Sequence, residues 1–228
     1  MAGFETATHA ICRNSSLISL CGVVLLALAV TVPANADTES RAVGPFHAIL
    51  VEGSWAADVT VGKDPSVVIE GDKDTIERVR TEVVDGVLRV RLEPGSFYSF
   101  FKRSKAEQLA AHITVPQLDA FTRSGSGEAS ITGLKEGKIV IESNGSGDLK
   151  ADGQATDLVL DLNGSGNADL ARLSADKASV TINGSGDIVV QAHDSLDATI
   201  NGSGDIRYIG EPAHLTTAVH GSGTIARK

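Results

Sequence analysis

Apolar and polar residues alternate on both sides of a tripeptide that recurs through the C-terminal half of the chain. Gly-Ser-Gly begins six times, at spacings of 20, 19, 20, 18 and 19 residues: Gly125, Gly145, Gly164, Gly184, Gly202 and Gly221. Apolar residues fall at every second position after the tripeptide, as in Leu149-Lys150-Ala151, and before it, as in Val180-Thr181-Ile182. A period of two indicates strands with one buried face. Each repeat is therefore predicted to be a strand, a Gly-Ser-Gly corner and a second strand.

One such repeat is too small to bury its own apolar face, so the repeats are expected to stack as rungs around a shared core. This predicts an all-β, right-handed parallel β-solenoid (β-helix) with regular rungs over residues 119–228. The apolar columns are interrupted at Arg123, Ser143, Thr217 and Arg227. We interpret these interruptions as polar caps at the two ends of the stack.

The residue before each corner is asparagine in the four central repeats: Asn144, Asn163, Asn183 and Asn201. Asparagine tolerates a left-handed backbone, and stacked asparagine side chains can bond from rung to rung. The glycines that follow, Gly145, Gly164, Gly184 and Gly202, supply the positive φ of the corner. We therefore predict structural roles for both columns.

The region before the repeats also has strand character. Short β-rich runs between residues 46 and 92 end at glycines, and Asp85-Gly86 separates two of them as in a β-hairpin. We interpret residues 45–118 as less regular rungs of the same stack, with a separate small β-domain as the alternative.

The N-terminal segment predicts export. An apolar run over residues 17–32 precedes Ala34-Asn35-Ala36, a small-x-small cleavage site. We predict a signal peptide over 1–36, a short linker over 37–44 and a head domain over 45–228, located in the periplasm or at the cell surface. An uncleaved membrane anchor is the alternative. Both cysteines, Cys12 and Cys21, lie in the leader, so the head has no disulfide and no cysteine metal site.

Charge and aromatic content indicate which class of ligand the chain is not expected to bind and which segment could contact a partner. The net charge of −9 argues against nucleic acid as a ligand. The chain has only nine aromatic residues, and four of them lie in an irregular segment, 93–109, that also carries basic side chains. This segment is predicted to be either a contact loop or a cap on the solenoid. Its residues of interest are Phe97, Tyr98, Phe100, Phe101, Lys102, Arg103 and Lys105.

Two chemical alternatives arise from carboxylates beside the corners, of which Asp148, Asp187 and Asp205 are three. A stacked column of carboxylates could bind calcium, or supply the paired acids of a polysaccharide-active enzyme. Turn chemistry alone also explains aspartate at this position. His193-Asp194-Ser195 contains triad residue types, but adjacency in sequence is not triad geometry. We expect no catalytic residues, no metal and no cofactor.

Several motifs together resemble one bacterial family. They are Pro45-Phe46-His47-Ala48-Ile49, Ile69-Glu70-Gly71-Asp72, Val87-Leu88-Arg89-Val90, Ile113-Thr114-Val115-Pro116-Gln117-Leu118 and the Asn-Gly-Ser-Gly-Asp repeats. The chain resembles the putative auto-transporter adhesin family with a head GIN domain over about residues 43–228. The resemblance implies an exported, envelope-associated β-helical protein that acts in adhesion, and it supplies no catalytic residues. The expected partner is an envelope component, a polysaccharide or a protein surface.

Overall fold

The computed structural model describes residues 37–93 and 109–228. Strands make up 71% of the described residues and helix 2%, which confirms the all-β class. Residues 35–228 form one compact unit. The predicted signal peptide, residues 1–36, lies outside the described residues.

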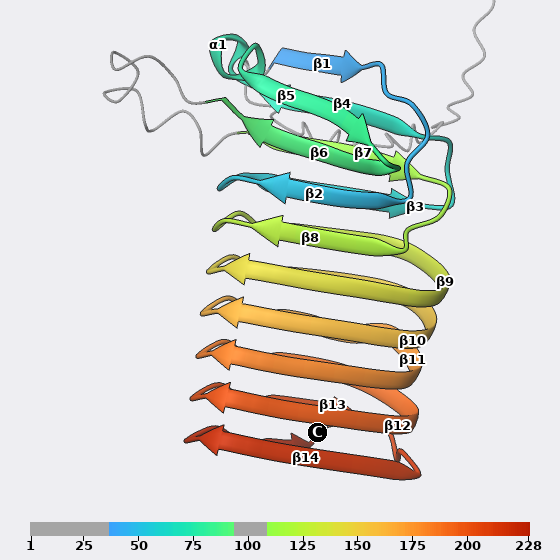
Figure 1. Cartoon of the computed structure of the whole chain (residues 1–228), viewed down its shortest axis with the longest axis vertical. Coiled ribbons are helices and arrows are strands. Elements are labelled where there is room, and N and C mark those ends of the chain that lie inside the picture. Colours follow the sequence, from blue (N-terminus) through green and yellow to red (C-terminus); the bar gives the residue numbers. More distant parts are fainter. Residues whose placement is uncertain (1–36, 94–108) are drawn as a thin grey trace, which may run out of the picture. The chain divides into compact units, whose positions relative to one another are not determined.

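The repeats form a solenoid of about five turns. Its long strands bend between the two faces of the coil: β9 (Ala129–Gly145), β10 (Leu149–Gly164), β11 (Ala168–Gly184) and β12 (Ile188–Gly202). The last rungs contain β13 (Ile206–Ile209), β14 (His214–Gly221) and β15 (Ile225–Arg227). In Figure 1 the chain runs from right to left along the near sheet, returns along the far sheet and descends one rung per circuit. This is the right-handed path that parallel crossovers favour.

Consecutive rungs pair in parallel and in register. Asn163 lies between Asn144 and Asn183, and Gly164 lies between Gly145 and Gly184. The apolar positions consequently stack as columns inside the coil, where Leu160, Val180 and Ala198 are almost completely buried. Aliphatic packing along the whole column is the main source of stability that this architecture offers.

The region before the repeats continues the same stack. Strands β2 (Ala48–Glu52) and β8 (Ala120–Ser124) pair in parallel, as do β3 (Ala56–Val61) and β7 (Ala110–Val115). Strand β3 also pairs with β9, so the first rungs are joined directly to the repeats.

The predicted hairpin is present as β5 (Val79–Val84) and β6 (Val87–Leu92), which pair antiparallel. Asp85 and Gly86 have φ values of 52° and 77°. Two consecutive positive φ angles are typical of the tight turn that matches strand twist.

The N-terminal end of the stack is closed by antiparallel strands and one short helix. Strand β1 (Asp37–Arg41) pairs with β4 (Ser66–Gly71), which pairs with β7, and α1 (Lys73–Ile76) follows β4. Residues 37–41 of the segment predicted as a linker over 37–44 therefore form a strand of the sheet. The sequence of this strand has no apolar alternation that could have predicted it. It lies at the edge of the sheet, where backbone pairing with β4 holds it.

The interruptions at Arg123 and Ser143 do not mark an end of the stack, which corrects the sequence-based interpretation. Both side chains are buried in the interior, at 1% and 0% exposure. The Arg123 guanidinium donates to the Ser143 hydroxyl at 2.6 Å, to the Gly147 carbonyl at 2.7 Å and to the Gly127 carbonyl. Polar residues can occupy this column because they bond one another and the corner backbone. Thr217 and Arg227, by contrast, do lie in the last rung.

Candidate functional site

The predicted asparagine column forms a hydrogen-bonded ladder. Asn163 Nδ2 donates to Asn144 Oδ1 at 2.8 Å, Asn183 Nδ2 to Asn163 Oδ1 at 2.7 Å, and Asn201 Nδ2 to Asn183 Oδ1 at 2.8 Å. At the upper end, Asn144 Nδ2 donates to Glu142 Oε1 at 3.0 Å. Because every amide of the ladder is engaged with a neighbouring rung, this column serves to fix the register of the corners.

The corner glycines are required for packing as well as for conformation. Gly145, Gly164, Gly184 and Gly202 have φ values between 136° and 151°. A Cβ added at Gly164, Gly184 or Gly202 would collide with the carbonyl oxygen of the glycine one rung before it. Only glycine allows both the positive φ and the close stacking of corner backbones.

The aspartates beside the corners accept backbone N–H groups from the following rung. Asp187 Oδ1 accepts from the Asp205 N–H at 2.9 Å, and Asp205 Oδ1 accepts from the Thr224 N–H at 2.9 Å. Asp148 Oδ1 accepts both the backbone and the side-chain N–H of Asn167, at 3.1 and 3.0 Å. Within 37–93 and 109–228, no group of three or more histidine, cysteine or acidic side chains is arranged to hold a metal ion. The hydrogen bonds of Asp148, Asp187 and Asp205 cap the turns of the following rungs.

A shallow groove crosses the outer face of the sheet formed by β10, β11, β12 and β14. Its volume is about 230 Å³. Charged and hydroxyl side chains on neighbouring rungs line it, among them Asp157, Lys177, Ser179, Asp197 and Thr216. Lys177 and Asp197 are exposed. Asp157 and Lys177 face one another on neighbouring rungs, and Asp197 lies in the adjacent outward row one rung further along.

Sequence reasoning did not single out this groove. Its polar residues fall at outward positions that look like ordinary solvated strand residues when read along one repeat. They become neighbours only through the register that pairs Asp157 with Lys177 and Ser179 with Asp197. An alignment of the repeats would have shown these outward polar positions in neighbouring rows.

The histidine of the His193-Asp194-Ser195 run contacts residues outside that run. His193 Nε2 lies 2.9 Å from the Ser174 hydroxyl of the preceding rung and 3.5 Å from the Gln191 amide. These contacts are exposed to solvent, whereas a nucleophile and its base work in a site that restricts water and orients the base.

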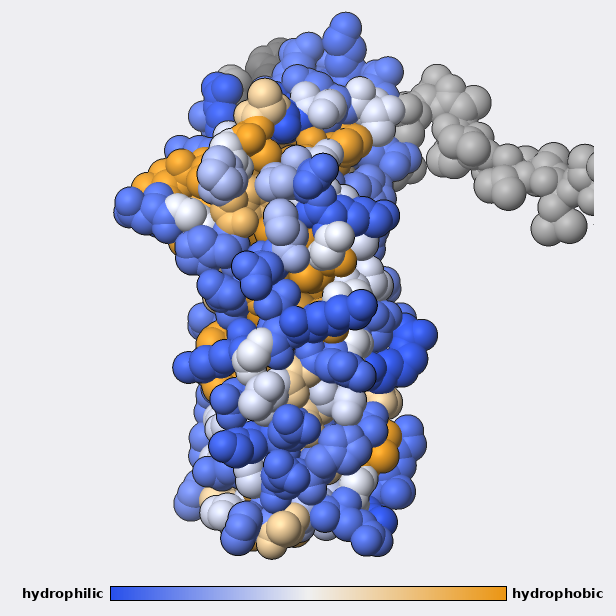
Figure 2. Space-filling view, turned by 90° about the vertical axis from the view of Figure 1, so that its right-hand side faces the viewer, coloured by the Kyte–Doolittle hydropathy of each residue, from blue (hydrophilic) through white to orange (hydrophobic). Residues whose placement is uncertain are grey.

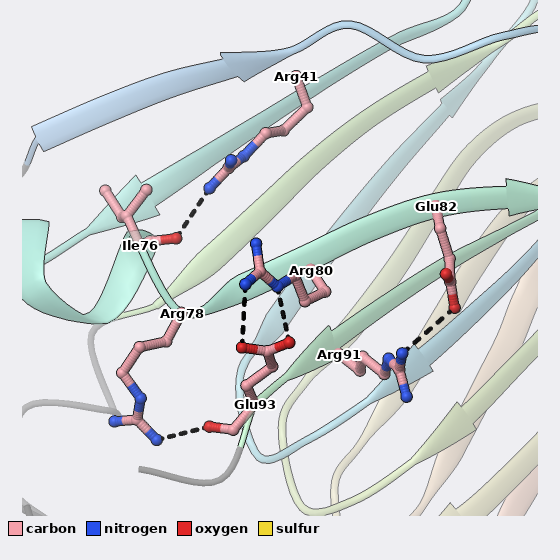
Figure 3. A network of polar contacts seen from close by, with 7 residues as sticks. All are labelled: Arg41, Ile76, Arg78, Arg80, Glu82, Arg91 and Glu93. Carbon is pink, nitrogen blue, oxygen red and sulfur yellow. Dashed lines mark hydrogen bonds and ion pairs between the residues drawn. The ribbon is translucent and has the colours of Figure 1, made fainter. Parts of the chain in front are cut away.

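A polar network fixes the strand that leads into residues 94–108. Figure 3 shows that Arg80 binds both carboxylate oxygens of Glu93, at 2.7 and 3.1 Å, while Arg78 donates to the Glu93 carbonyl at 2.7 Å. The Arg80 hydrogen bond lowers the pKa of Glu93, and the Glu93 hydrogen bond raises the pKa of Arg80. The pair is therefore present above the ordinary carboxyl pKa of 4.5 and is lost as the pH falls through the lowered value.

The contact loop predicted from its aromatic and basic residues begins just beyond this network. Its seven residues lie outside the described part of the chain: Phe97, Tyr98, Phe100, Phe101, Lys102, Arg103 and Lys105. Their roles stay predictions.

The surface differs between the two ends of the head. Figure 2 shows that hydrophilic side chains cover most of the lower rungs on the side opposite the Gly-Ser-Gly corners, whereas hydrophobic side chains gather toward the N-terminal end. None of the described helices is long and apolar enough to span a membrane.

Comparison with known proteins gives one family and several solved structures. The family model "putative auto-transporter adhesin, head GIN domain" matches residues 45–212. A putative adhesin from Bacteroides fragilis has a similar structure, with a TM-score of 0.70 and 24% identity, and the match covers 86% of this chain and 98% of that one.

Two further structures share the fold at lower similarity. A putative lipid binding protein from Parabacteroides distasonis has a TM-score of 0.53 and 22% identity, covering 86% of this chain and 98% of that one. A putative adhesin from Parabacteroides merdae has a TM-score of 0.51 and 21% identity, covering 86% and 97%. No curated protein matches the chain. At these identities the structures establish the fold alone.

Proposed function

The chain belongs to the family of putative auto-transporter adhesins with a head GIN domain, and we propose that it is an exported, non-enzymatic binding protein of the bacterial cell envelope. The family assignment suggests adhesion as its role and the cell surface or periplasm as its location. The predicted leader over residues 1–36 is in keeping with export.

The observation that carries the proposal is the groove across β10, β11, β12 and β14. At about 230 Å³ it is too small to enclose a drug-sized ligand. A ligand held there would lie across the sheet and extend beyond the groove at both ends. Adjacent rungs place their side chains ~4.8 Å apart, so a polymer of polar units would meet a further polar side chain at each rung. We therefore propose a polysaccharide of the envelope as the ligand.

The lining suits such a ligand. Lys177 donates hydrogen bonds, Asp157 and Asp197 accept them, and Ser179 and Thr216 do both. Sugar hydroxyls need donors and acceptors side by side, and charge-assisted bonds are the stronger ones.

The carboxylates beside the corners, which the sequence offered as paired acids, have a capping role and do not line the groove. Glycoside hydrolysis needs two carboxyl groups that flank the scissile bond. Asp148, Asp187 and Asp205 instead use Oδ1 to accept backbone or side-chain N–H groups of the next rung. Their regular recurrence is accounted for by this capping role.

The test uses the chain without its predicted leader (residues 37–228), here called the exported chain, and a panel of purified bacterial envelope polysaccharides. Binding is measured by isothermal titration calorimetry, and new reducing ends are measured in the same samples. We expect saturable binding to at least one polysaccharide and no new reducing ends. The absence of binding across the panel would refute the polysaccharide ligand, and release of reducing ends would show that the protein is an enzyme.

A further inference from the structure

The last rung has an unpaired strand edge. Strand β14 pairs with β12 alone and β15 pairs with β13 alone among the described residues. The outer backbone groups of β14 therefore have no sheet partner within the described chain. Figure 1 shows β14 at the end of the stack opposite β1.

Core-type side chains are exposed along this edge. Leu215 and Val219 continue the buried columns of Leu196 and Ile200, yet they are 46% and 42% exposed. Val84 is the other large hydrophobic residue that is exposed in the described part of the chain. Apolar columns that end in solvent, beside free backbone donors and acceptors, are an unsatisfied packing surface.

The sequence of β14 is nearly symmetric about Thr217. It reads His214-Leu215-Thr216-Thr217-Ala218-Val219-His220. In an antiparallel pair of two such strands centred on Thr217, Leu215 would face Val219 of the partner strand and Thr217 would face its own copy. Aliphatic pairs and threonine pairs at facing positions stabilise antiparallel strands.

The opposite end of the solenoid is unsuited to this kind of contact. Strand β1 carries Asp37, Glu39 and Arg41 along its length, and it has no large apolar residue. Charged edge strands resist pairing. A head-to-tail stack of molecules is thereby disfavoured, and a closed pair joined through equal ends is the arrangement that remains.

We propose that β14 is a self-association edge, where a second copy of this chain docks by antiparallel β14–β14 pairing around a two-fold axis through Thr217. The two solenoids then continue one another across the contact. Strand β14 has no acidic, lysine or arginine side chain, and Arg227 in β15 is neutralised by Glu211 at 2.8 Å. No unpaired charge among these residues opposes the approach. This inference is independent of the proposed polysaccharide binding.

The contact is small, which sets the expected affinity. Eight residues extend for roughly 26 Å, and the two sheets of a coil lie about 10 Å apart. Such an end face is smaller than a standard protein interface. We therefore expect a reversible dimer with a Kd in the micromolar range or weaker.

Analytical ultracentrifugation of the exported chain, over concentrations that span this range, provides the test. We expect the wild-type chain to show a monomer–dimer equilibrium. Thr217→Lys and Thr217→Glu each place like charges on the two-fold axis, so each variant alone should be monomeric. An equimolar mixture of the two variants should dimerise again, because opposite charges then meet. Val84→Lys serves as a control at the other exposed apolar residue and should dimerise like wild type.

Circular dichroism shows whether each variant is folded, and the mixture experiment keeps the test valid if both variants are somewhat destabilised. A wild-type chain that stays monomeric would overturn the proposal. Dimers that persist in either single variant, or that are lost in Val84→Lys, would place the contact elsewhere. Open-ended oligomers would contradict the two-fold arrangement.

Discussion

Each corner glycine lies directly beside the glycine of the previous rung, so the missing side chain is a packing requirement at every corner. Sequence reasoning assigned these glycines to positive φ, and Gly184 has a φ of 150°. The collision between an added Cβ and the preceding glycine carbonyl could not be predicted from one repeat, because it depends on how closely two rungs approach.

Gly184→Ala should therefore destabilise the protein by about 3 kcal/mol or more, from strained backbone and from overpacking. Gly137→Ala is the matched control, because an added Cβ there meets nothing within 4 Å. That control should change the free energy of unfolding by less than about 1 kcal/mol. Urea denaturation measures both. Equal effects of the two substitutions would contradict the stacking explanation.

Arg123, like Ser143, was wrongly interpreted from the apolar pattern as part of a polar cap, whereas it is buried inside the stack. An isolated polar residue in an apolar column looks the same in sequence whether it caps an end or bonds inside the core. Its three acceptors come from two adjacent rungs: the Gly127 carbonyl from its own corner, and the Ser143 hydroxyl and Gly147 carbonyl from the next. Burial lowers the pKa of the Arg123 guanidinium, and the attraction of Asp148 opposes this shift.

Arg123→Lys should lower the free energy of unfolding by about 2–3 kcal/mol, because an ammonium group cannot reach all three acceptors and leaves buried groups unsatisfied. Arg172→Lys is the control, since the Arg172 side chain is 76% exposed. The control should stay within about 0.5 kcal/mol of wild type. Thermal or urea unfolding that ranks the two variants equally would argue against a structural role for the buried guanidinium.

At the scale of elements, the repeat pattern predicted the strands and corners. It predicted the contacts between stacked corners only in part. The asparagine ladder was expected from the recurrence of Asn163, Asn183 and Asn201, and it is present. The aspartate column was left open between calcium binding and turn chemistry. The choice depends on where each Oδ1 points, which spacing along the chain does not specify.

Because Asp187 and Asp205 use Oδ1 to cap the next rung, we expect calcium to leave the melting temperature unchanged within about 1 °C. A specific site present at 100 times its Kd would add about 2.7 kcal/mol, which corresponds to several degrees for a domain of this size. Differential scanning fluorimetry in calcium chloride, with magnesium chloride at equal ionic strength as the control, measures this. A rise of several degrees with calcium alone would show that the column binds the ion.

At the scale of the whole molecule, the solenoid and its family could be predicted from sequence because the repeat is long, regular and bounded by glycine. The closed N-terminal end could not, since β1 has no alternation and is held through backbone bonds to β4. The groove was missed for a related reason: Asp157, Lys177 and Asp197 lie in different repeats and become neighbours only through rung register.

The central claim, that the exported head holds an envelope polysaccharide in this groove, is tested most directly by comparing Lys177→Ala with Lys150→Ala. Lys177 lines the groove, whereas Lys150 is exposed on the other sheet of the coil, in the row that continues into β13. In calorimetric titrations with the bound polysaccharide, loss of one charge-assisted hydrogen bond should weaken binding about tenfold in Lys177→Ala. Lys150→Ala should bind as wild type does. Equal affinities of the two variants would show that the groove is not the binding site.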